Sequence, residues 1–370
     1  MSNKSLSILG IVAVVMVVLA VITSKMTQTG SGTVKSAFNL VQGLDPARIA
    51  KIVITEKDKT LEVIQQGGKF VVAEKDNYPA SIKTVNELIA RVLDVKANPD
   101  VLTSSSANYA DLMVADSNAG EIIKFLDSDG KIITGVIIGK RLDTGDATIR
   151  LVGKDEVYTT PSNLWINVSA IGVMETKIFS AAADKIVKVS VKYDSGSYEM
   201  TRQQGSSDVN FVTALPAGKQ LKGRDYEQVF NALSNLSFTD VMAEAKASEM
   251  KFDTTYTCQI DDSTVYTFLV AVKDGKYFAK CSNEFTDLSQ IQISQTDSQD
   301  ELKKKEAKLL ARDNAAKFNA VHKGWVYEIA STQAENLTKK IDAIIEDVPV
   351  AQPVDANDAN IAPVGAAVTE

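Results

Sequence analysis

The chain has 370 residues, of which 45% are hydrophobic and 24% charged, proportions that predict a packed globular core over most of its length. Its formal net charge of -7 argues against nucleic acid as a partner, because phosphate binding needs a concentrated basic face. The one basic run, residues 303–305, lies between Glu301 and Glu306 and is typical of a solvated helix face.

Residues 6–22 form an uncharged apolar run between Lys4 and Lys25. Extended to residue 24, a helix of about 19 residues reaches roughly 28 Å, close to the ~30 Å hydrocarbon core of a bilayer. We therefore predict a transmembrane anchor in residues 1–25. A cleavable signal peptide is the alternative, but no clear A-x-A site follows the run. The apolar side chains of the predicted anchor are Leu6, Ile8, Leu9, Ile11, Val12, Val14, Val15, Val17, Val18, Leu19, Val21 and Ile22.

The charges beside this run say little about orientation, since one lysine stands on each side. Export of the long C-terminal part, with the amino terminus left in the cytoplasm, is the default expectation for such an anchor. Residues 26–43, rich in Thr, Ser and Gly, predict a flexible linker between membrane and fold.

Beyond the linker, the sequence predicts one structural unit present twice. The β-rich alternation of residues 47–54 has a partner in residues 184–191, and Phe70 corresponds to Phe211 at an offset of 141. The same offset carries through a predicted helix, at 82–93 in the first copy. Its apolar positions at i, i+3, i+4 and i+7 must be buried against the preceding strands.

In the second copy the corresponding predicted helix covers residues 222–236. Hairpins follow in both copies, around the turns at 127–130 and 261–263. An insertion at about 285–320 distinguishes the second copy, and its charged pattern predicts a long amphipathic helix. The tail from residue 349 to 370 has no aromatic residue and no periodicity, which predicts disorder.

These elements predict an α+β fold class, with an N-terminal transmembrane helix followed by two tandem repeats of antiparallel sheet packed with helices. The predicted boundaries of the first repeat are residues 44–178. Those of the second repeat are residues 179–348.

The order of these landmarks resembles a known bacterial family. The strand after Leu44, the strand at 68–72, the helix at 82–93 and the ending from Gly324 to Tyr327 are similar to the family called domain of unknown function 4340. The resemblance covers roughly residues 44–346. The resemblance implies that such proteins are similar to, and often encoded near, auxiliary subunits of ABC-2-type exporters, including those linked with gliding motility. The family has no established catalytic residues.

Sequence motifs for catalysis and metal binding are weak or lacking. The chain has one histidine, His322, near the end of the predicted charged helix, where a dipole contact or a surface position is the simpler interpretation. We therefore expect His322→Ala to be silent. Asp127 and Asp129 resemble part of a calcium loop, but Phe125 occupies the position of the first ligand. No phosphate-binding loop is present, so any ATP-driven work belongs to a partner.

Two tryptophans, Trp165 and Trp325, lie near the ends of the two repeats. Core packing is the simpler interpretation, and an exposed aromatic contact is the functional one. The only cysteines, Cys258 and Cys281, fall on the outer strands of a predicted three-stranded meander. At ~4.8 Å per strand they lie about 9.6 Å apart, whereas a disulfide needs Cα atoms within about 7 Å. We therefore predict free, buried thiols.

The sequence thus predicts a non-enzymatic, membrane-anchored auxiliary or binding subunit of an envelope complex. With the resemblance, the expected site is the bacterial inner membrane, with most of the chain in the periplasm. The bilayer would hold residues 6–24, and an ABC permease or ATPase would be the protein partner. No cofactor and no metal are expected, and any small-molecule ligand is unknown. The alternative is a structural scaffold that links envelope components through its two lobes.

Overall fold

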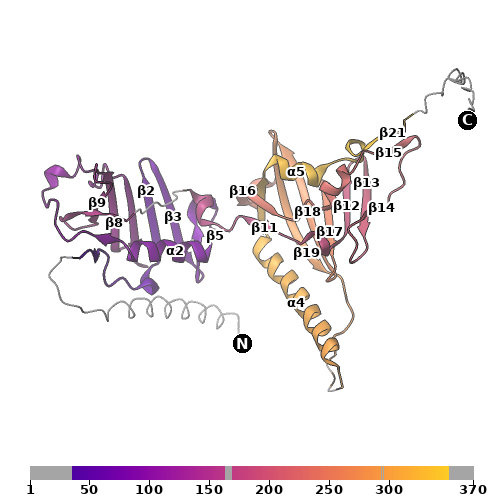
Figure 1. Cartoon of the computed structure of the whole chain (residues 1–370), viewed down its shortest axis with the longest axis horizontal. Coiled ribbons are helices and arrows are strands. Elements are labelled where there is room, and N and C mark those ends of the chain that lie inside the picture. The colour runs from indigo at the N-terminus through magenta and orange to yellow at the C-terminus, as the bar shows by residue number, and fades with distance from the viewer. Residues whose placement is uncertain (1–35, 163–168, 293, 295, 350–370) are drawn as a thin grey trace, which may run out of the picture.

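A computed structural model describes residues 36–162, 169–292, 294 and 296–349. Strands hold 40% of this part and helices 24%. The strands form two large antiparallel sheets side by side along the long axis of the molecule (Figure 1). The four α-helices of the described part are α2 (Ile82–Leu93), α3 (Asp225–Phe230), α4 (Gln299–His322) and α5 (Ser331–Thr338).

The first unit is built on an eight-stranded sheet in the order β10-β9-β8-β7-β2-β3-β4-β5, with a separate pair β1-β6. Its strands are β1 (Phe38–Asn39), β2 (Lys51–Glu56), β3 (Lys59–Gln66), β4 (Lys69–Val72), β5 (Tyr78–Pro79), β6 (Lys96–Ala97), β7 (Glu121–Leu126), β8 (Ile132–Arg141), β9 (Ala147–Leu151) and β10 (Val157–Thr160).

The second unit is built on a nine-stranded sheet in the order β11-β16-β20-β19-β18-β17-β12-β13-β14, with a separate pair β15-β21. Its strands are β11 (Lys177–Phe179), β12 (Ile186–Tyr193), β13 (Gly196–Arg202), β14 (Val209–Phe211), β15 (Lys219–Leu221), β16 (Leu236–Ala243), β17 (Phe252–Ile260), β18 (Thr264–Lys273), β19 (Lys276–Phe285), β20 (Trp325–Ile329) and β21 (Ile345–Asp347).

The two sheets share one strand order. From β10 to β4 the first sheet reads β10-β9-β8-β7-β2-β3-β4, and from β20 to β14 the second reads β20-β19-β18-β17-β12-β13-β14. The pairs β1-β6 and β11-β16 also correspond. This order is the one that a repeated unit requires. The units differ most between β19 and β20, where α4 is inserted.

Local sequence explains these elements. In β2 the buried positions alternate with half-buried ones, so Ile52 and Ile54 face the core. Helix α2 begins after Ser81, whose hydroxyl accepts a hydrogen bond from the Thr84 N–H. The apolar stripe of α2 is buried as predicted, through Val85, Leu88, Ile89 and Val92.

The predicted fold class is wrong as stated, because the described chain is mainly β-sheet. The second-copy helix, expected over 222–236, is only the six residues of α3: Asn231 ends it, and residues from Leu236 onward belong to strand β16. No helix within the described ranges is long and apolar enough to cross a membrane. The predicted anchor, residues 6–24, lies outside those ranges.

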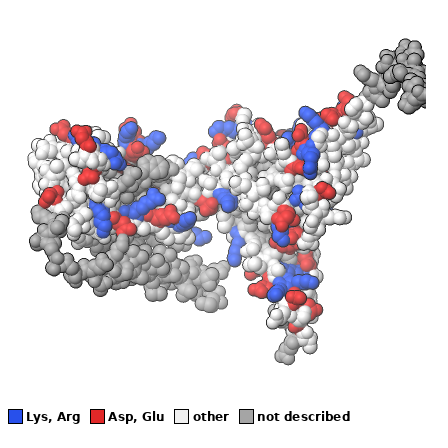
Figure 2. Space-filling view, viewed as in Figure 1, with Lys and Arg blue, Asp and Glu red and all other residues white. Residues whose placement is uncertain are grey.

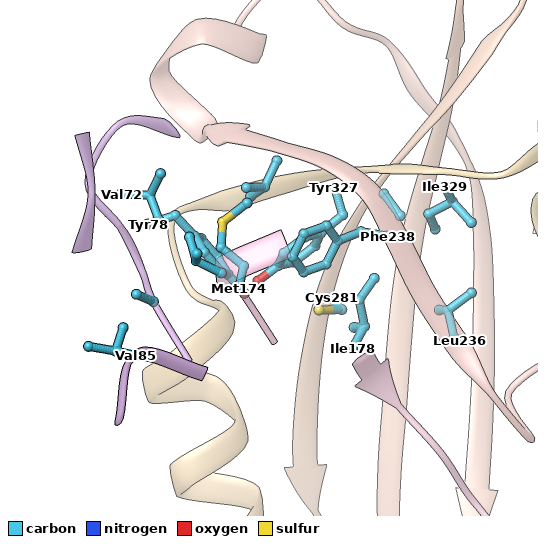
Figure 3. Packing of buried hydrophobic residues seen from close by; sticks show 14 of the residues in the cluster. Val72, Tyr78, Val85, Met174, Ile178, Leu236, Phe238, Cys281, Tyr327 and Ile329 are labelled. Carbon is cyan, nitrogen blue, oxygen red and sulfur yellow. The ribbon is translucent and has the colours of Figure 1, made fainter. Parts of the chain in front are cut away.

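The two units share one hydrophobic core cluster. Tyr78 of β5 lies edge-on to Phe238, Trp325 and Tyr327 of the second unit, with ring centroids 5.6, 4.9 and 6.2 Å away. Figure 3 shows this junction, where Met174 also packs against the rings. Because buried aromatic area is a large source of packing energy, the junction couples the two sheets.

Polar contacts reinforce the junction beside Tyr78. Lys75 forms an ion pair with Asp240 at 2.6 Å. Asp76 accepts a hydrogen bond from the Ala243 N–H at 3.0 Å and pairs with Lys246. The hydrogen bond from Ala243, together with Lys246, lowers the pKa of the Asp76 carboxyl. Asp76 has a left-handed backbone (φ 55°), which aspartate tolerates better than most residues.

Glu121, at the start of β7, makes the stability of the first unit depend on pH. Burial, with Glu56 nearby, raises the pKa of its carboxyl to about 8, and one of its oxygens is buried without a hydrogen-bond partner in the described part. An unfolded glutamate ionises near pH 4.3. The unfolded chain therefore loses this proton first, and the free energy of unfolding should fall as the pH rises from about 4.3 to about 8.

Glu121→Gln should flatten this dependence, since glutamine has the same shape and no charge. Urea unfolding midpoints at about pH 5 and pH 8 measure the effect. Glu74→Gln is the control, because Glu74 lies at an exposed site. An unchanged pH slope in Glu121→Gln would show that Glu121 is ionised in the folded protein.

Candidate functional site

A pocket of about 430 Å³ opens in the second unit, where strands β19 and β20 part. Its walls come from β18, β19, the end of α4 and the start of β20. The residues on which its chemistry depends are Lys280, Cys281, Asn319, His322, Lys323 and Trp325.

The insertion of α4 creates this opening. β19 pairs with β18 along all ten of its residues, but with β20 only over Tyr277, Phe278 and Ala279. In the first unit the corresponding strand β10 pairs with β9 over its whole length. The last turns of α4 occupy the vacated edge, where the Asn319 amide donates to the Asn283 C=O at 2.6 Å and accepts from its N–H at 2.8 Å.

A narrow stripe of buried side chains holds helix α4 against this edge of the sheet. Ala311, Ala315 and His322 are buried on one face, with Phe318 packed against the core. The N-terminal half of the helix projects away from the sheet (Figure 1). A capping box at Ser298 and Glu301 fixes its first turn. The predicted amphipathic helix is therefore present, although its apolar face covers only the sheet edge.

His322 lies against the pocket wall and is only 7% exposed. Its Nδ1 is 2.7 Å from the Tyr327 hydroxyl, and the Phe318 ring lies 4.3 Å away. Burial lowers the pKa of the imidazole to about 4, so the ring is neutral at pH 7 and is a weak base. The interpretation of His322 as a surface residue is wrong. Truncation to alanine removes packed volume, so a loss of stability should accompany it.

This histidine should make the second unit sensitive to acid. Its pKa is near 6.5 when unperturbed and about 4 in the folded chain. Between these values the unfolded chain binds a proton that the folded chain does not, so the free energy of unfolding should decrease as the pH falls from 6.5 to about 4. His322→Gln, which cannot titrate, should lose this decrease. Thermal unfolding at several pH values measures it, and a parallel decrease in both proteins would contradict it.

Trp325 is half-buried at the start of β20 and lines the pocket. Its ring also packs edge-on against Tyr78 of the first unit. Core packing of Trp325 is thus observed, and its role as an aromatic contact residue stays a prediction. Trp165, the other predicted contact residue, lies outside the described residues.

Cys258 and Cys281 are free and buried. The meander of β17, β18 and β19 places them on strands either side of β18, so the prediction of separate thiols is confirmed. Burial raises the pKa of Cys258 to about 12 and raises that of Cys281 as well. Since the thiolate is the nucleophile, neither side chain is reactive at neutral pH.

The acidic turn at 127–130 has a structural role. An Asp127 carboxylate oxygen accepts hydrogen bonds from the N–H groups of Asp129 and Lys131, at 3.1 and 2.9 Å. These bonds close the hairpin between β7 and β8. Among the residues that the structure describes, no group of three or more His, Cys, Asp or Glu side chains is placed to hold a metal ion.

Sequence reasoning did not find the pocket. Asn319, Lys280 and Glu244 carry no motif, and they meet only because α4, β19 and the turn that follows β16 converge. The one signal in the sequence was the insertion itself, since a helix placed between two paired strands must separate them.

The comparisons with known proteins give one family. A family model described as Domain of unknown function (DUF4340) matches residues 71–255, half of the chain. This span runs from β4 to β17, so it includes the junction of the two units. No curated protein matches the chain.

Proposed function

We propose a function for this chain, which belongs to the family described as Domain of unknown function (DUF4340). It is a non-enzymatic auxiliary and binding subunit of a bacterial envelope complex. An ABC-2-type exporter is the complex that we favour. The resemblance to exporter auxiliary proteins supports that choice, and the apolar run at residues 6–22 supports attachment to the inner membrane.

One observation carries the binding role: the second unit has an open pocket whose only histidine is neutral and bonded to Tyr327. A general base should have a pKa near the working pH, and a value of about 4 for His322 does not meet that need. The pocket thus fits recognition better than catalysis. The mixed surface charge visible in Figure 2 favours no single-sign partner on that face.

Attachment to a membrane would make modest affinity sufficient. A tethered module meets a membrane partner at high effective concentration, so a small contact surface suffices. The exported lobes would then bind an ABC permease or its ATPase-coupled assembly, and residues 6–24 would contact the bilayer.

The scaffold role is the second candidate, and the junction favours it. Tyr78 packs on three aromatic rings, and Lys75 and Asp76 bond to the neighbouring unit. Two lobes fixed in this way could hold two envelope components at a set distance. Neighbouring genes separate the candidates, because adjacent permease and ATPase genes favour the exporter role.

Affinity purification from membranes tests the proposal. The full chain should recover an ABC permease or its ATPase. A chain without residues 1–25 should remain folded but lose its function in the cell. A reporter active only in the cytoplasm, fused at the carboxyl end, should be inactive. Recovery of neither transporter component, with a fully active truncated chain, would contradict both the exporter link and the membrane attachment.

A further inference from the structure

We propose, building on the binding role above, that the pocket between β19 and β20 receives one apolar residue of an extended peptide. The peptide would bond to the open strand edges and place its side chain against Trp325. The ligand class is therefore an uncharged, extended segment of a partner protein.

The first step concerns the direction of the backbone groups on β19. The N–H and C=O of Asn283 point toward α4, because both bond to Asn319. In an antiparallel ladder every second residue points its backbone groups to the same side. Cys281 therefore directs its N–H and C=O toward the same edge, which is where the pocket lies.

The second step concerns the opposite strand. Tyr327 pairs with Ala279, and continuing that register would place Trp325 opposite Cys281. The ladder ends before this pair. Two strand edges thus face each other across the pocket, and backbone N–H and C=O groups require hydrogen-bond partners. An extended peptide residue offers one donor and one acceptor on the same side, and peptides that add a strand to an exposed sheet edge bind through such groups.

The third step concerns the side chain that the pocket would accept. Trp325 and Leu269 supply apolar surface, and Leu269 is 36% exposed. At the mouth, Lys280 is 2.7 Å from Glu244, so these two charges largely cancel, and the third charged residue of the lining, Lys323, is exposed to solvent. A volume of about 430 Å³ lies within the range of small-ligand pockets. An uncharged residue of leucine size fits this lining.

The test uses the full chain labelled with 5-fluorotryptophan, in which the signal of Trp325 is assigned by Trp325→Phe. Titration with N-acetyl-leucine N-methylamide should shift the Trp325 resonance saturably. Methylation of the leucine nitrogen removes the donor and keeps the side chain. That analogue should bind roughly five- to tenfold more weakly, the loss expected for one hydrogen bond.

Two substitutions locate the binding. Ser282→Arg fills the pocket from an exposed position on β19 and should abolish the shift, whereas Glu284→Arg, exposed on the same strand but outside the lining, should preserve it. If Ser282→Arg unfolds the chain, Leu269→Arg is the second variant that fills the pocket. Equal binding of both probes, no shift, or unchanged binding in the pocket variants would overturn the peptide site. Recovery of a transporter partner by Ser282→Arg protein would then leave the proposed function intact.

Discussion

Replacing Arg150 by methionine is expected to lower the free energy of unfolding by roughly 2–4 kcal/mol. The Arg150 side chain is only 5% exposed on β9. Its Nε and Nη2 donate to the Val114 C=O at 3.0 and 2.8 Å, and its Nη1 donates to the Lys154 C=O at 2.9 Å. The guanidinium also lies 4.5 Å from the Tyr109 ring centroid.

The cost arises because methionine fills the space but leaves the carbonyl of buried Val114 without its donors. The segment between β6 and β7 would lose one of its attachments to the sheet, the bonds at Val114, so protease should cleave it faster than in the parent chain. Urea unfolding measures the stability. Arg312→Met is the matched control, since that side chain is 58% exposed, and it should change stability by less than about 0.5 kcal/mol. Equal effects of the two substitutions would refute the role of Arg150.

Replacing Tyr78 by alanine is expected to loosen the junction between the units and to cost roughly 3–5 kcal/mol. Tyr78 is 4% exposed, and its ring contacts Phe238, Trp325 and Tyr327. Within the described residues, Tyr78 is the one aromatic ring of the first unit that packs against those three. Its loss leaves a cavity between the two sheets, which Met174, two ion pairs and the hydrogen bond from Ala243 to Asp76 also join.

Calorimetry should then resolve two transitions, because each sheet keeps its own core, whereas the parent chain should show one. Tyr226→Ala on α3 is the control, since this tyrosine is half-buried away from the junction, and it should preserve a single transition. A single transition at unchanged temperature in Tyr78→Ala would show that the junction does not couple the units. Such a result would also weaken the scaffold candidate.

Local pattern in the sequence was sufficient to locate many elements of this fold. The alternation in β2 and the capped apolar stripe of α2 depend on residues near one another in the chain, so period and spacing reveal them. The meander of β17 to β19 followed from its turns, and with it the separation of Cys258 from Cys281. The offset between the copies likewise anticipated the shared strand order, because a repeated pattern folds into a repeated ladder.

The proportion of helix and strand was less accessible to sequence. The helix expected over 222–236 and the strand β16 compete for the same residues. Pairing of β16 with both β11 and β20 favours the strand. Such pairing joins residues far apart in the chain, and tertiary contacts routinely override local propensity.

The sequence by itself therefore determined where most strands, the two long helices and the free thiols lie, since these depend on neighbours in the chain. Only the tertiary structure decided that His322 is buried, that Arg150 holds a loop, and that Tyr78 joins the units. It also decided the pocket, which exists because α4 separates two strands that pair in the other copy. The physical reason is common to all four: each depends on contacts between distant segments, and no local periodicity encodes which distant partner a side chain will meet.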